Sequence, residues 1–180
     1  MHPLNLREAV REDAAAIANL HAESWRVTYR GSYSDEFLDG PVFQDRLDVW
    51  TKRMTAPAAN QFVMLAEDDS GIVGFACAYG GDSEQWGSLL DNLHVRRQEH
   101  RHGVGTRLVA EVARWSRANY PGRGLYLWVV GQNHNARRFY ERLGATDRGG
   151  ELKPPSAGGG EPRDVRRYAW EAPIDIQVQP

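Results

Sequence analysis

A basic turn containing two glycines lies between an apolar run and a helix-forming segment, and it is the part of the chain best suited to chemistry. Helical spacing of apolar residues restarts at Val104, directly after the turn. A helix N-terminus presents unpaired backbone N–H groups and a partial positive charge, and glycine lets a ligand come close to the backbone. The turn therefore predicts an anion site, best suited to a pyrophosphate. Its basic and glycine residues are Arg96, Arg97, His100, Arg101, His102, Gly103 and Gly105.

Other types of site fit this turn less well. The chain has no GxxxxGK[ST] segment and no GxGxxG segment, so it lacks both the P-loop and the dinucleotide fingerprint. Taken alone, the segment is also consistent with a plain strand–turn–helix connection, because glycines mark many turns. A nucleic-acid surface is disfavoured, since the net charge is −2 and no aromatic platform interleaves the basic residues. We expect no nucleic-acid partner.

Composition predicts one globular domain over residues 1–180. The chain is 41% hydrophobic and holds six tryptophans, which is enough for a core of its own. Cys77, the single cysteine, lies in an apolar run and predicts a buried thiol in a reducing cytoplasm. No apolar run approaches the ~20 residues that span a bilayer, so no membrane association is expected. His21 and His94 lack metal-ligand spacing with cysteines or carboxylates, so we read both as ordinary packed or surface residues and expect no metal.

Seven segments carry the alternation or the apolar runs of strands. The second to the fourth follow one another with short turns between them, which predicts an antiparallel meander. The Pro- and Gly-rich segment 153–162, before the last strand, is expected to be a mobile loop or a hairpin tip. The expected strands are 4–10, 61–67, 72–80, 86–95, 125–130, 145–149 and 164–171.

Helical spacing and breaker residues predict helices between these strands. A first helix is expected to begin at residues 11–13, where acidic side chains complement the helix dipole. The aromatic, turn-rich segment 25–39 is expected to form a broken helix or a loop. Pro57 ends the next helix and Gly144 the last one. The remaining expected helices are 43–54, 104–119 and 133–143. This order predicts an α/β fold with a mixed sheet and helices on both faces.

The order of elements and several short motifs resemble the GNAT superfamily of acetyl-CoA-dependent N-acetyltransferases over nearly the whole chain. Residues 92–105 resemble the CoA-binding motif of this family, and residues 127–144 resemble its second, more specific motif. The resemblance implies a single-domain, mostly antiparallel sheet with a bulged or splayed pair of strands at the cofactor site. Further segments that resemble the family are 7–9, 13–17, 25–31, 37–39 and 168–170.

The activity implied by the resemblance is direct transfer of an acetyl group from acetyl-CoA to a primary amine in a ternary complex. Acetyl-CoA is then the cosubstrate, and the acceptor is a small molecule or a peptide. Backbone groups of Leu93 and Val95 are expected to contact the pantetheine, and the N–H near Leu93 is the expected oxyanion donor. The residues expected to bind the cofactor are Leu93, His94, Val95, His100, Arg101, His102, Gly103, Val104, Gly105, Thr106, Asn133 and Tyr140.

The CoA-binding segment departs from the family pattern at three positions. Arg97 stands where proline is common, His100 where Gln or Arg is usual, and Arg101 where glycine is frequent. Because His100 still donates hydrogen bonds and backbone N–H groups carry most of such a contact, we expect CoA binding to be retained. The sequence leaves open how these replacements change its affinity and its dependence on pH.

Tyr140 is the expected general acid. A phenol has a pKa of ~10 and keeps its proton at neutral pH, so it can protonate the departing thiolate. Spacing alone favours a core tyrosine on the helix, whereas the Phe139-Tyr140 resemblance favours catalysis. Asn133, at the start of the same helix, is expected to cap it, to contact the cofactor, or both.

The general base is less well defined. The family often carries Glu at the position of Leu89, which has no titratable group. Asp91 lies two residues further along the strand and therefore on the same face, so it is our candidate for taking the acceptor's proton through water. The alternative is a solvated or salt-bridged strand aspartate. Asp82 and Glu84, in the preceding turn, are weaker candidates.

Aromatic residues are expected to line the acceptor pocket, with Trp25, Tyr29 and Tyr33 in one wall and Trp86 in another, although core packing explains each one singly. The alternative function is a non-catalytic acyl-CoA-binding module. The presence of Leu89 where the family often carries Glu supports this alternative, whereas the presence of Tyr140 as a candidate general acid opposes it. Dimers are common in the resembled family, and the sequence leaves a homodimer open.

Overall fold

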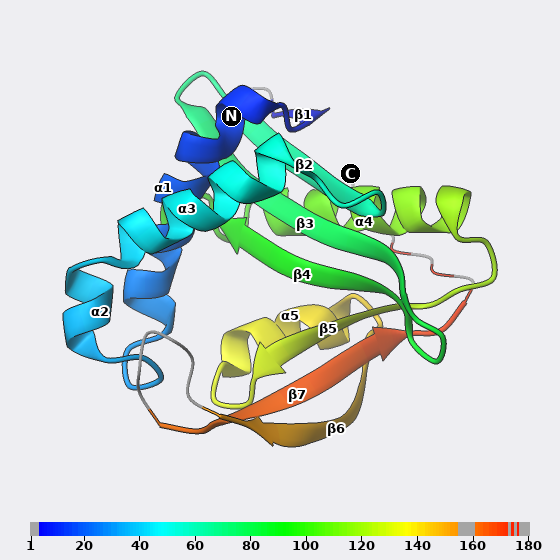
Figure 1. Ribbon diagram of the computed structural model, residues 1–180. Helices are drawn as coiled ribbons and strands as arrows, with labels where there is room; N and C mark the ends of the chain where they lie inside the picture. The colour runs from blue at the N-terminus through cyan, green and yellow to red at the C-terminus, as the bar shows by residue number, and fades with distance from the viewer. Residues whose placement is uncertain (1–3, 155–160, 173, 175, 177–180) are drawn as a thin grey trace.

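A seven-stranded sheet in the order β1-β2-β3-β4-β5-β7-β6 forms the centre of the protein (Figure 1). The computed structural model describes residues 4–154, 161–172, 174 and 176. Strands β4 and β5 are parallel, whereas the other neighbouring strands pair antiparallel. The strands are β1 (Asn5–Glu8), β2 (Gln61–Asp68), β3 (Gly71–Ser83), β4 (Gly87–Val95), β5 (Leu125–Val130), β6 (Thr146–Lys153) and β7 (Arg163–Trp170).

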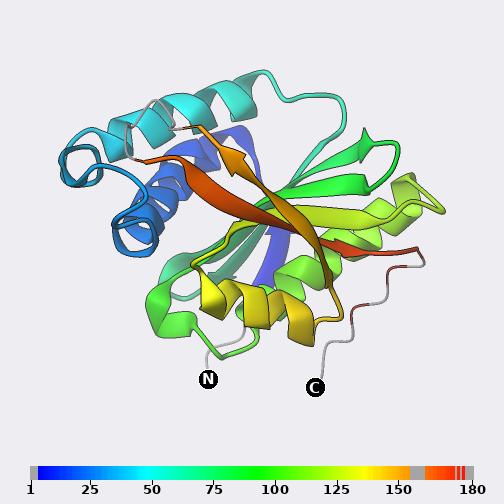
Figure 2. The same cartoon turned by 90° about the horizontal axis from the view of Figure 1, so that it is seen from below.

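Helices cover both faces of this sheet, with α1 and α3 on one face and α4 and α5 on the other (Figure 2). On the first face, Trp50 of α3 and Ile17 of α1 share a buried cluster with Phe75 of β3. On the second, Leu108 of α4 shares one with Leu127 of β5. The helices are α1 (Ala14–Thr28), α2 (Asp35–Asp39), α3 (Val42–Thr55), α4 (Val104–Asn119) and α5 (His134–Arg142), and the short 3₁₀ turns are η1 (Arg11–Asp13) and η2 (Arg97–Glu99).

The predicted α/β fold is confirmed, including the meander of β2, β3 and β4 and the mostly antiparallel sheet. Within the described part of the chain, no helix has both the length and the apolar composition that a membrane span requires.

Several element ends differ from the prediction. Helix α1 follows the turn η1 and continues to Thr28, so Trp25 lies inside this helix rather than in a broken one. Strand β6 runs to Lys153 rather than ending at residue 149, because β7 supplies pairing partners as far as Arg163 and a register shift accommodates Arg148 and Gly149. Of the loop expected over residues 153–162, residues 155–160 lie outside the described part of the chain.

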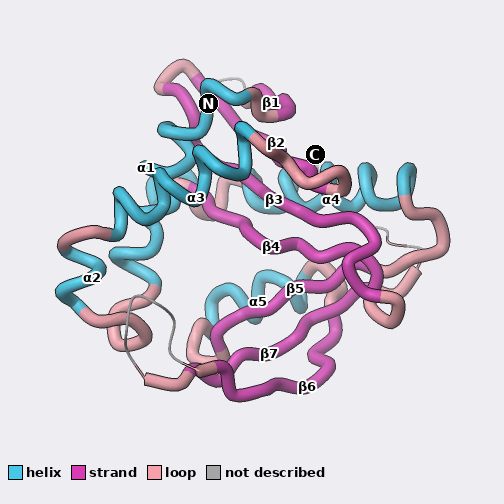
Figure 3. Tube along the Cα trace, in the orientation of Figure 1, coloured by secondary structure: helices cyan, strands magenta, loops and turns pink. Residues whose placement is uncertain are grey.

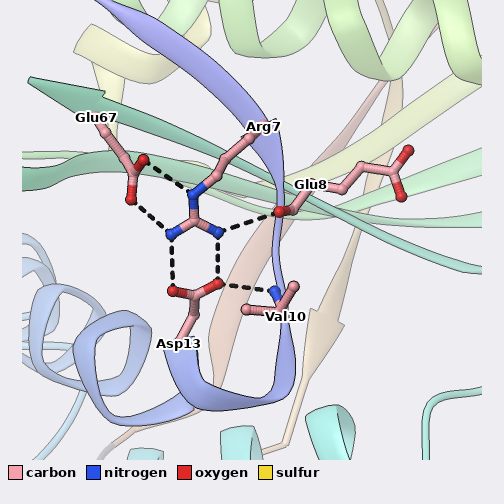
Figure 4. A network of polar contacts seen from close by, with 5 residues as sticks. All are labelled: Arg7, Glu8, Val10, Asp13 and Glu67. Atoms are coloured by element: carbon pink, nitrogen blue, oxygen red, sulfur yellow. Dashed lines mark hydrogen bonds and ion pairs between the residues drawn. The ribbon is translucent and has the colours of Figure 1, made fainter.

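The guanidinium of Arg7 fastens the first strand to its neighbours (Figure 4). Its Nη1 and Nη2 lie 2.7 and 2.9 Å from the two carboxylate oxygens of Asp13, and its Nε and Nη2 lie 2.9 and 2.6 Å from those of Glu67. Asp13 also accepts a hydrogen bond from the backbone N–H of Val10. The Arg7 hydrogen bonds lower the pKa of Asp13. One side chain therefore joins β1, β2 and the turn that enters α1.

We expect Arg7→Met to lower the free energy of unfolding by about 1–2 kcal/mol, because it leaves two carboxylates without their partly exposed partner. Arg114→Met, which removes one exposed ion pair to Glu111, is the matched control and should cost less than about 0.5 kcal/mol. Folding lowers the pKa of Asp13. The contribution of its carboxylate to the free energy of unfolding is therefore present above the ordinary pKa of ~3.9 and is lost as the pH falls through the pKa of the folded state. Denaturant unfolding should therefore show the difference between wild type and Arg7→Met shrinking from pH 7 to pH 3. A difference that is independent of pH would contradict this assignment.

Candidate active site

Strands β4 and β5 pair at only two positions and then diverge, as the tube view shows (Figure 3). The pairs are Ser88 with Leu125 and Leu89 with Tyr126. Beyond them each strand continues, but the two no longer pair with each other. The sheet is therefore open along this seam, which confirms the predicted splayed strand pair.

An extra residue in β4 accompanies the divergence. Cys77 of β3 pairs with Asn92 and Ala78 pairs with Leu90, so Asp91 is left without a partner in β3. A bulge of this kind bends its strand and increases the local twist. The bend lies directly after the last residues at which β4 pairs with β5.

The backbone of β4 beyond the bulge offers hydrogen-bonding groups to the opening. The N–H of Arg96 donates to the carbonyl of Val73 in β3 at 2.7 Å. Because main-chain groups alternate between the two edges of a strand, those of His94 also lie on the β3 side. The main-chain groups of Leu93 and Val95 therefore lie on the edge that faces β5.

Helix α4 begins beside the end of β4 with an open N-terminus. Its N-cap is Gly103, with φ +79°, and this residue has no side chain to satisfy the N–H groups of the first turn. A Cβ added at Gly103 would meet nothing within 4 Å, so the space beside this residue is open. Arg101 also has a positive φ, of 69°, and it is exposed. In the first turn itself, Val104 is buried and Thr106 is half-buried.

The two histidines of the turn have different neighbours. Nε2 of His100 lies 3.0 Å from the carbonyl of Val95, so this ring is tied back to the end of β4. Nδ1 of His102 lies 3.2 Å from the carboxylate of Glu99. The ring of His100 is thus the closer of the two to the opening between the strands.

Gly105 has a packing role in the structure. A Cβ at this position would lie 3.3 Å from Cζ of Phe139 and 3.8 Å from Cγ2 of Val95. Gly105 therefore allows α5 and β4 to pack tightly against the first turn of α4. Of the two motif glycines, Gly103 is the one with open space in front of its backbone.

Tyr140 of α5 belongs to the buried cluster beneath the splayed strands. Its ring meets those of Phe139 and Trp170 edge-on, at centroid distances of 5.1 and 6.2 Å. Burial raises the pKa of Tyr140, and the neighbouring hydroxyl of Tyr29 raises it further. Tyr140 therefore keeps its proton over the whole physiological range.

At the start of α5, the side chain of Asn133 accepts a hydrogen bond from the N–H of Ala136 at 3.1 Å, which confirms the predicted N-cap.

The three aromatic residues expected in one wall do form one cluster. Trp25 lies 5.3 Å from Tyr29 and 4.8 Å from Tyr33, measured between ring centroids. Burial raises the pKa of Tyr29 to about 12. The guanidinium carbon of Arg46 lies 4.2 Å from the ring centroid of Trp25. The sequence did not indicate this arginine, or Phe37, which stacks on Tyr33.

Trp86 forms a separate aromatic group at the β3–β4 turn. Its partner is Arg167 of β7, whose guanidinium carbon lies 4.8 Å from the ring centroid of Trp86 and 4.3 Å from that of Trp128. Asp82 lies in the last part of β3 rather than in the turn where it was expected, and it accepts a hydrogen bond from the hydroxyl of Tyr126. The two predicted aromatic walls are thus distinct groups in the structure.

Asp91 is in a salt bridge, which is the alternative that the sequence left open. One of its carboxylate oxygens lies 2.7 Å from Nη1 of Arg53 in α3. The same nitrogen lies 2.9 Å from the side-chain oxygen of Asn92. The guanidinium carbon of Arg53 also lies 5.7 Å from the ring centroid of Tyr79, which pairs across the sheet with Leu89. Asp91 and Leu89 therefore share the face covered by α3, as predicted.

His21 and His94 lie against each other on the same face, with ring centroids 4.4 Å apart. Nδ1 of His21 accepts a hydrogen bond from the indole N–H of Trp50 at 2.9 Å, and Nδ1 of His94 lies 2.8 Å from the hydroxyl of Ser24. Burial lowers the pKa of His94 to about 3 and that of His21 well below its usual range. Both rings are neutral and packed. Among the described residues, no group of three or more His, Cys, Asp and Glu side chains is arranged to hold a metal ion.

Known proteins resemble this chain in sequence and in fold. A model described as the acetyltransferase (GNAT) family matches residues 15–145. The uncharacterized N-acetyltransferase YuaI of Bacillus subtilis is 30% identical over 133 residues, which cover 72% of this chain and 73% of YuaI.

Two solved structures share the fold at lower identity. One is yncA of Salmonella typhimurium with its cofactor acetyl-CoA, at a TM-score of 0.67 and 18% identity over 99% of this chain and 98% of that one. The other is the paiA N-acetyltransferase of Thermoplasma acidophilum in complex with coenzyme A, at a TM-score of 0.65 and 18% identity over 93% of this chain and 99% of that one. These two similarities concern the fold, whereas the family match and YuaI give the assignment. The chain belongs to the acetyltransferase (GNAT) family of N-acetyltransferases.

Proposed function

We propose that this protein transfers the acetyl group of acetyl-CoA to a primary amine by direct attack in a ternary complex. The observation that carries the proposal is the seam between β4 and β5, which pairs only at its start and leaves an edge of β4 without a partner strand. An extended pantetheine arm fits such an edge, because its amides can pair as a strand would. Leu93 and Val95 provide the groups on that edge.

The pyrophosphate of acetyl-CoA is proposed to lie over residues 100–106. Here the open N-terminus of α4 offers N–H groups and the positive end of its dipole. Arg101, His100 and His102 add donors around it. Asn133 caps α5 nearby in the fold, and we propose that the same end of α5 borders the cofactor.

The proposed chemistry needs few groups from the chain. The neutral amine attacks the thioester carbonyl, a C–N bond forms, and the oxyanion is stabilised by the N–H near Leu93. The C–S bond then breaks, and Tyr140 gives its proton to the departing thiolate. The attacking nitrogen loses one proton, so the products are an amide and free CoA.

The acceptor is proposed to bind on the face covered by α1 and α3. Trp25, Tyr29 and Tyr33 form one wall there and Trp86 belongs to another. Asp91 lies on the same face and is proposed to attract the ammonium and take its proton through water. Its salt bridge with Arg53 holds the carboxylate in place for this role.

Single-turnover transfer from acetyl-CoA across a panel of amines tests the proposal directly. We expect acetylated product in amounts that match the free CoA released. Tight binding of acetyl-CoA with no transfer to any amine would instead identify a non-catalytic acyl-CoA-binding module.

Gly103→Asp should weaken acetyl-CoA binding about tenfold or more, because it puts a negative charge where the pyrophosphate is proposed to lie. Gly103→Asn is the matched control, since Asn has the same shape without the charge and tolerates a positive φ equally well. Calorimetry should show a much larger loss of affinity for Asp than for Asn. Equal affinities in the two folded variants would remove this site.

Tyr140→Phe should leave the fold and the acetyl-CoA affinity intact while kcat falls ~10²–10⁴-fold, which is the usual contribution of a general acid. Tyr120→Phe, at the end of α4, serves as the control and should keep the wild-type kcat. Steady-state kinetics and calorimetry on both variants provide the measurement. A Tyr140→Phe enzyme with unchanged kcat would leave Tyr140 as a packing residue only.

Asp91→Asn keeps the size of the side chain and an acceptor for Arg53 but removes the charge. If Asp91 takes the proton, kcat should fall at neutral pH and recover in part at high pH, where free amine is abundant. If it only attracts the ammonium, KM should rise with little change in kcat. Profiles of kcat and KM from about pH 6 to about pH 10 separate proton transfer from charge attraction, because amines lose their proton toward the upper end of this range. No change in either parameter would show Asp91 to be a structural residue.

A further inference from the structure

Two arginines of β7, Arg163 and Arg167, have no acidic partner among the residues that the structure describes. Each is half-buried, and the Nε atom of each is shielded from solvent and has no hydrogen-bond partner among those residues. Within the described part of the chain, neither guanidinium makes an ion pair or a hydrogen bond to any residue. An exposed arginine without a partner is solvated by water, whereas a shielded one leaves its donors unsatisfied at a cost. The unmet donors point to a ligand.

Aromatic rings hold both guanidinium groups in place. Arg167 lies 4.3 and 4.8 Å from the ring centroids of Trp128 and Trp86, and Arg163 lies 4.7 Å from that of Tyr33. A planar guanidinium stacked on a ring keeps its edge free for two parallel hydrogen bonds to a carboxylate. The stacking therefore fixes the orientation of each group while leaving the edge formed by its two Nη atoms available to a ligand.

The two arginines lie on the face where the acceptor is proposed to bind. Residues 163 and 167 are four apart on one strand, so their side chains leave β7 on the same face. Arg163 reaches Tyr33 of the first aromatic wall, and Arg167 reaches Trp86 of the second. Asp91 belongs to the same neighbourhood, because, besides burial, its charge raises the pKa of Tyr29 and that of Arg163 lowers it. Near Arg167, burial and then Asp82, which accepts a hydrogen bond from Tyr126, raise the pKa of Tyr126, whereas the charge of Arg167 lowers it.

This arrangement is unfavourable for a simple amine. An acceptor amine arrives as an ammonium, and two guanidinium groups that form no ion pair with a described residue repel it. The carboxylate of Asp91 is already shared with Arg53. A negative charge on the acceptor itself removes the repulsion and satisfies the free donors.

We infer that the acceptor carries a carboxylate beside its amine, as an amino acid does, and that Arg163 and Arg167 bind this carboxylate. The inference rests on the proposed acetyl transfer and specifies its substrate class. It makes both arginines specificity-determining residues of β7. They lie across the sheet from the open end of α4, so they belong to the acceptor rather than to the pyrophosphate.

The test uses three sets of probes: the protein amino acids, their amides, and the amines left by their decarboxylation. For the wild-type enzyme, kcat/KM should be at least about tenfold higher for the preferred amino acid than for its amide or its decarboxylated amine. Arg163→Gln and Arg167→Gln should each raise KM for that amino acid ~10–100-fold, with little change in kcat. KM for the amide and the affinity for acetyl-CoA should stay unchanged in both variants. Arg114→Gln, whose arginine is exposed on α4, is the matched control and should behave as wild type.

Each outcome decides the inference. A rise in KM confined to one of the two variants supports it and assigns the carboxylate to that arginine. Equal use of the amino acid and its amide by the wild-type enzyme overturns it while leaving acetyl transfer established. Loss of acetyl-CoA affinity in the Gln variants overturns it as well, because the arginines would then serve the cofactor. Transfer to no probe contradicts the proposed activity on amino-acid-like amines and removes the inference with it. Unfolding transitions of the three variants confirm that each one is folded.

Discussion

The departure of β4 from β5 is the constraint on which the candidate site depends. In a regular sheet, both edges of an inner strand are paired, and a half-buried edge left unpaired carries unsatisfied peptide groups that cost about 1–3 kcal/mol each. Here β3 holds one edge of β4 along its length, while the bulge at Asp91 turns the other edge away from β5 after two pairs. The fold thus keeps an unpaired strand edge inside its own sheet, and an extended ligand can complete it.

The rest of the structure keeps this opening in place. Gly105 lets Phe139 pack against the first turn of α4, so the helix that offers its N-terminus and the helix that carries Tyr140 are fixed to each other. Tyr140 comes from the face covered by α4 and α5, yet its hydroxyl interacts electrostatically with Tyr29, at the end of α1 on the other face. The seam is therefore where the two faces of the sheet meet. In the proposed reaction, cofactor and acceptor approach each other through it.

The sequence predicted the parts of this architecture that local patterns specify. Strand alternation and helical spacing predicted the element order, and the glycine turn before Val104 does lie at the N-terminus of α4. The salt bridge of Asp91 was left open, because its partner Arg53 lies on a helix that precedes β4 by many residues. Arg163 and Arg167 were missed because their meaning depends on sheet order. Only the insertion of β7 between β5 and β6 brings Arg167 beside Trp128. A basic residue in a late strand has no local pattern that distinguishes it from an ordinary surface residue.

Charge on the acceptor face follows from the same sheet order. The bulge that opens the sheet also places Asp91 where Arg53 of α3 can reach it, so the carboxylate of the bulge is already balanced. On the opposite side of the opening, β7 contributes two guanidinium groups, and its neighbours offer them aromatic rings rather than carboxylates. Stacking on a ring stabilises a cation by about 0.5–2 kcal/mol but satisfies none of its edge donors. The acceptor face is therefore electropositive on the β7 side, whereas on the β4 side the charges of Asp91 and Arg53 offset each other. A molecule with a positive and a negative end fits this gradient in one orientation only, with its ammonium toward Asp91 and its anionic end toward β7. That orientation would bring the amine to the seam, where the thioester is proposed to lie.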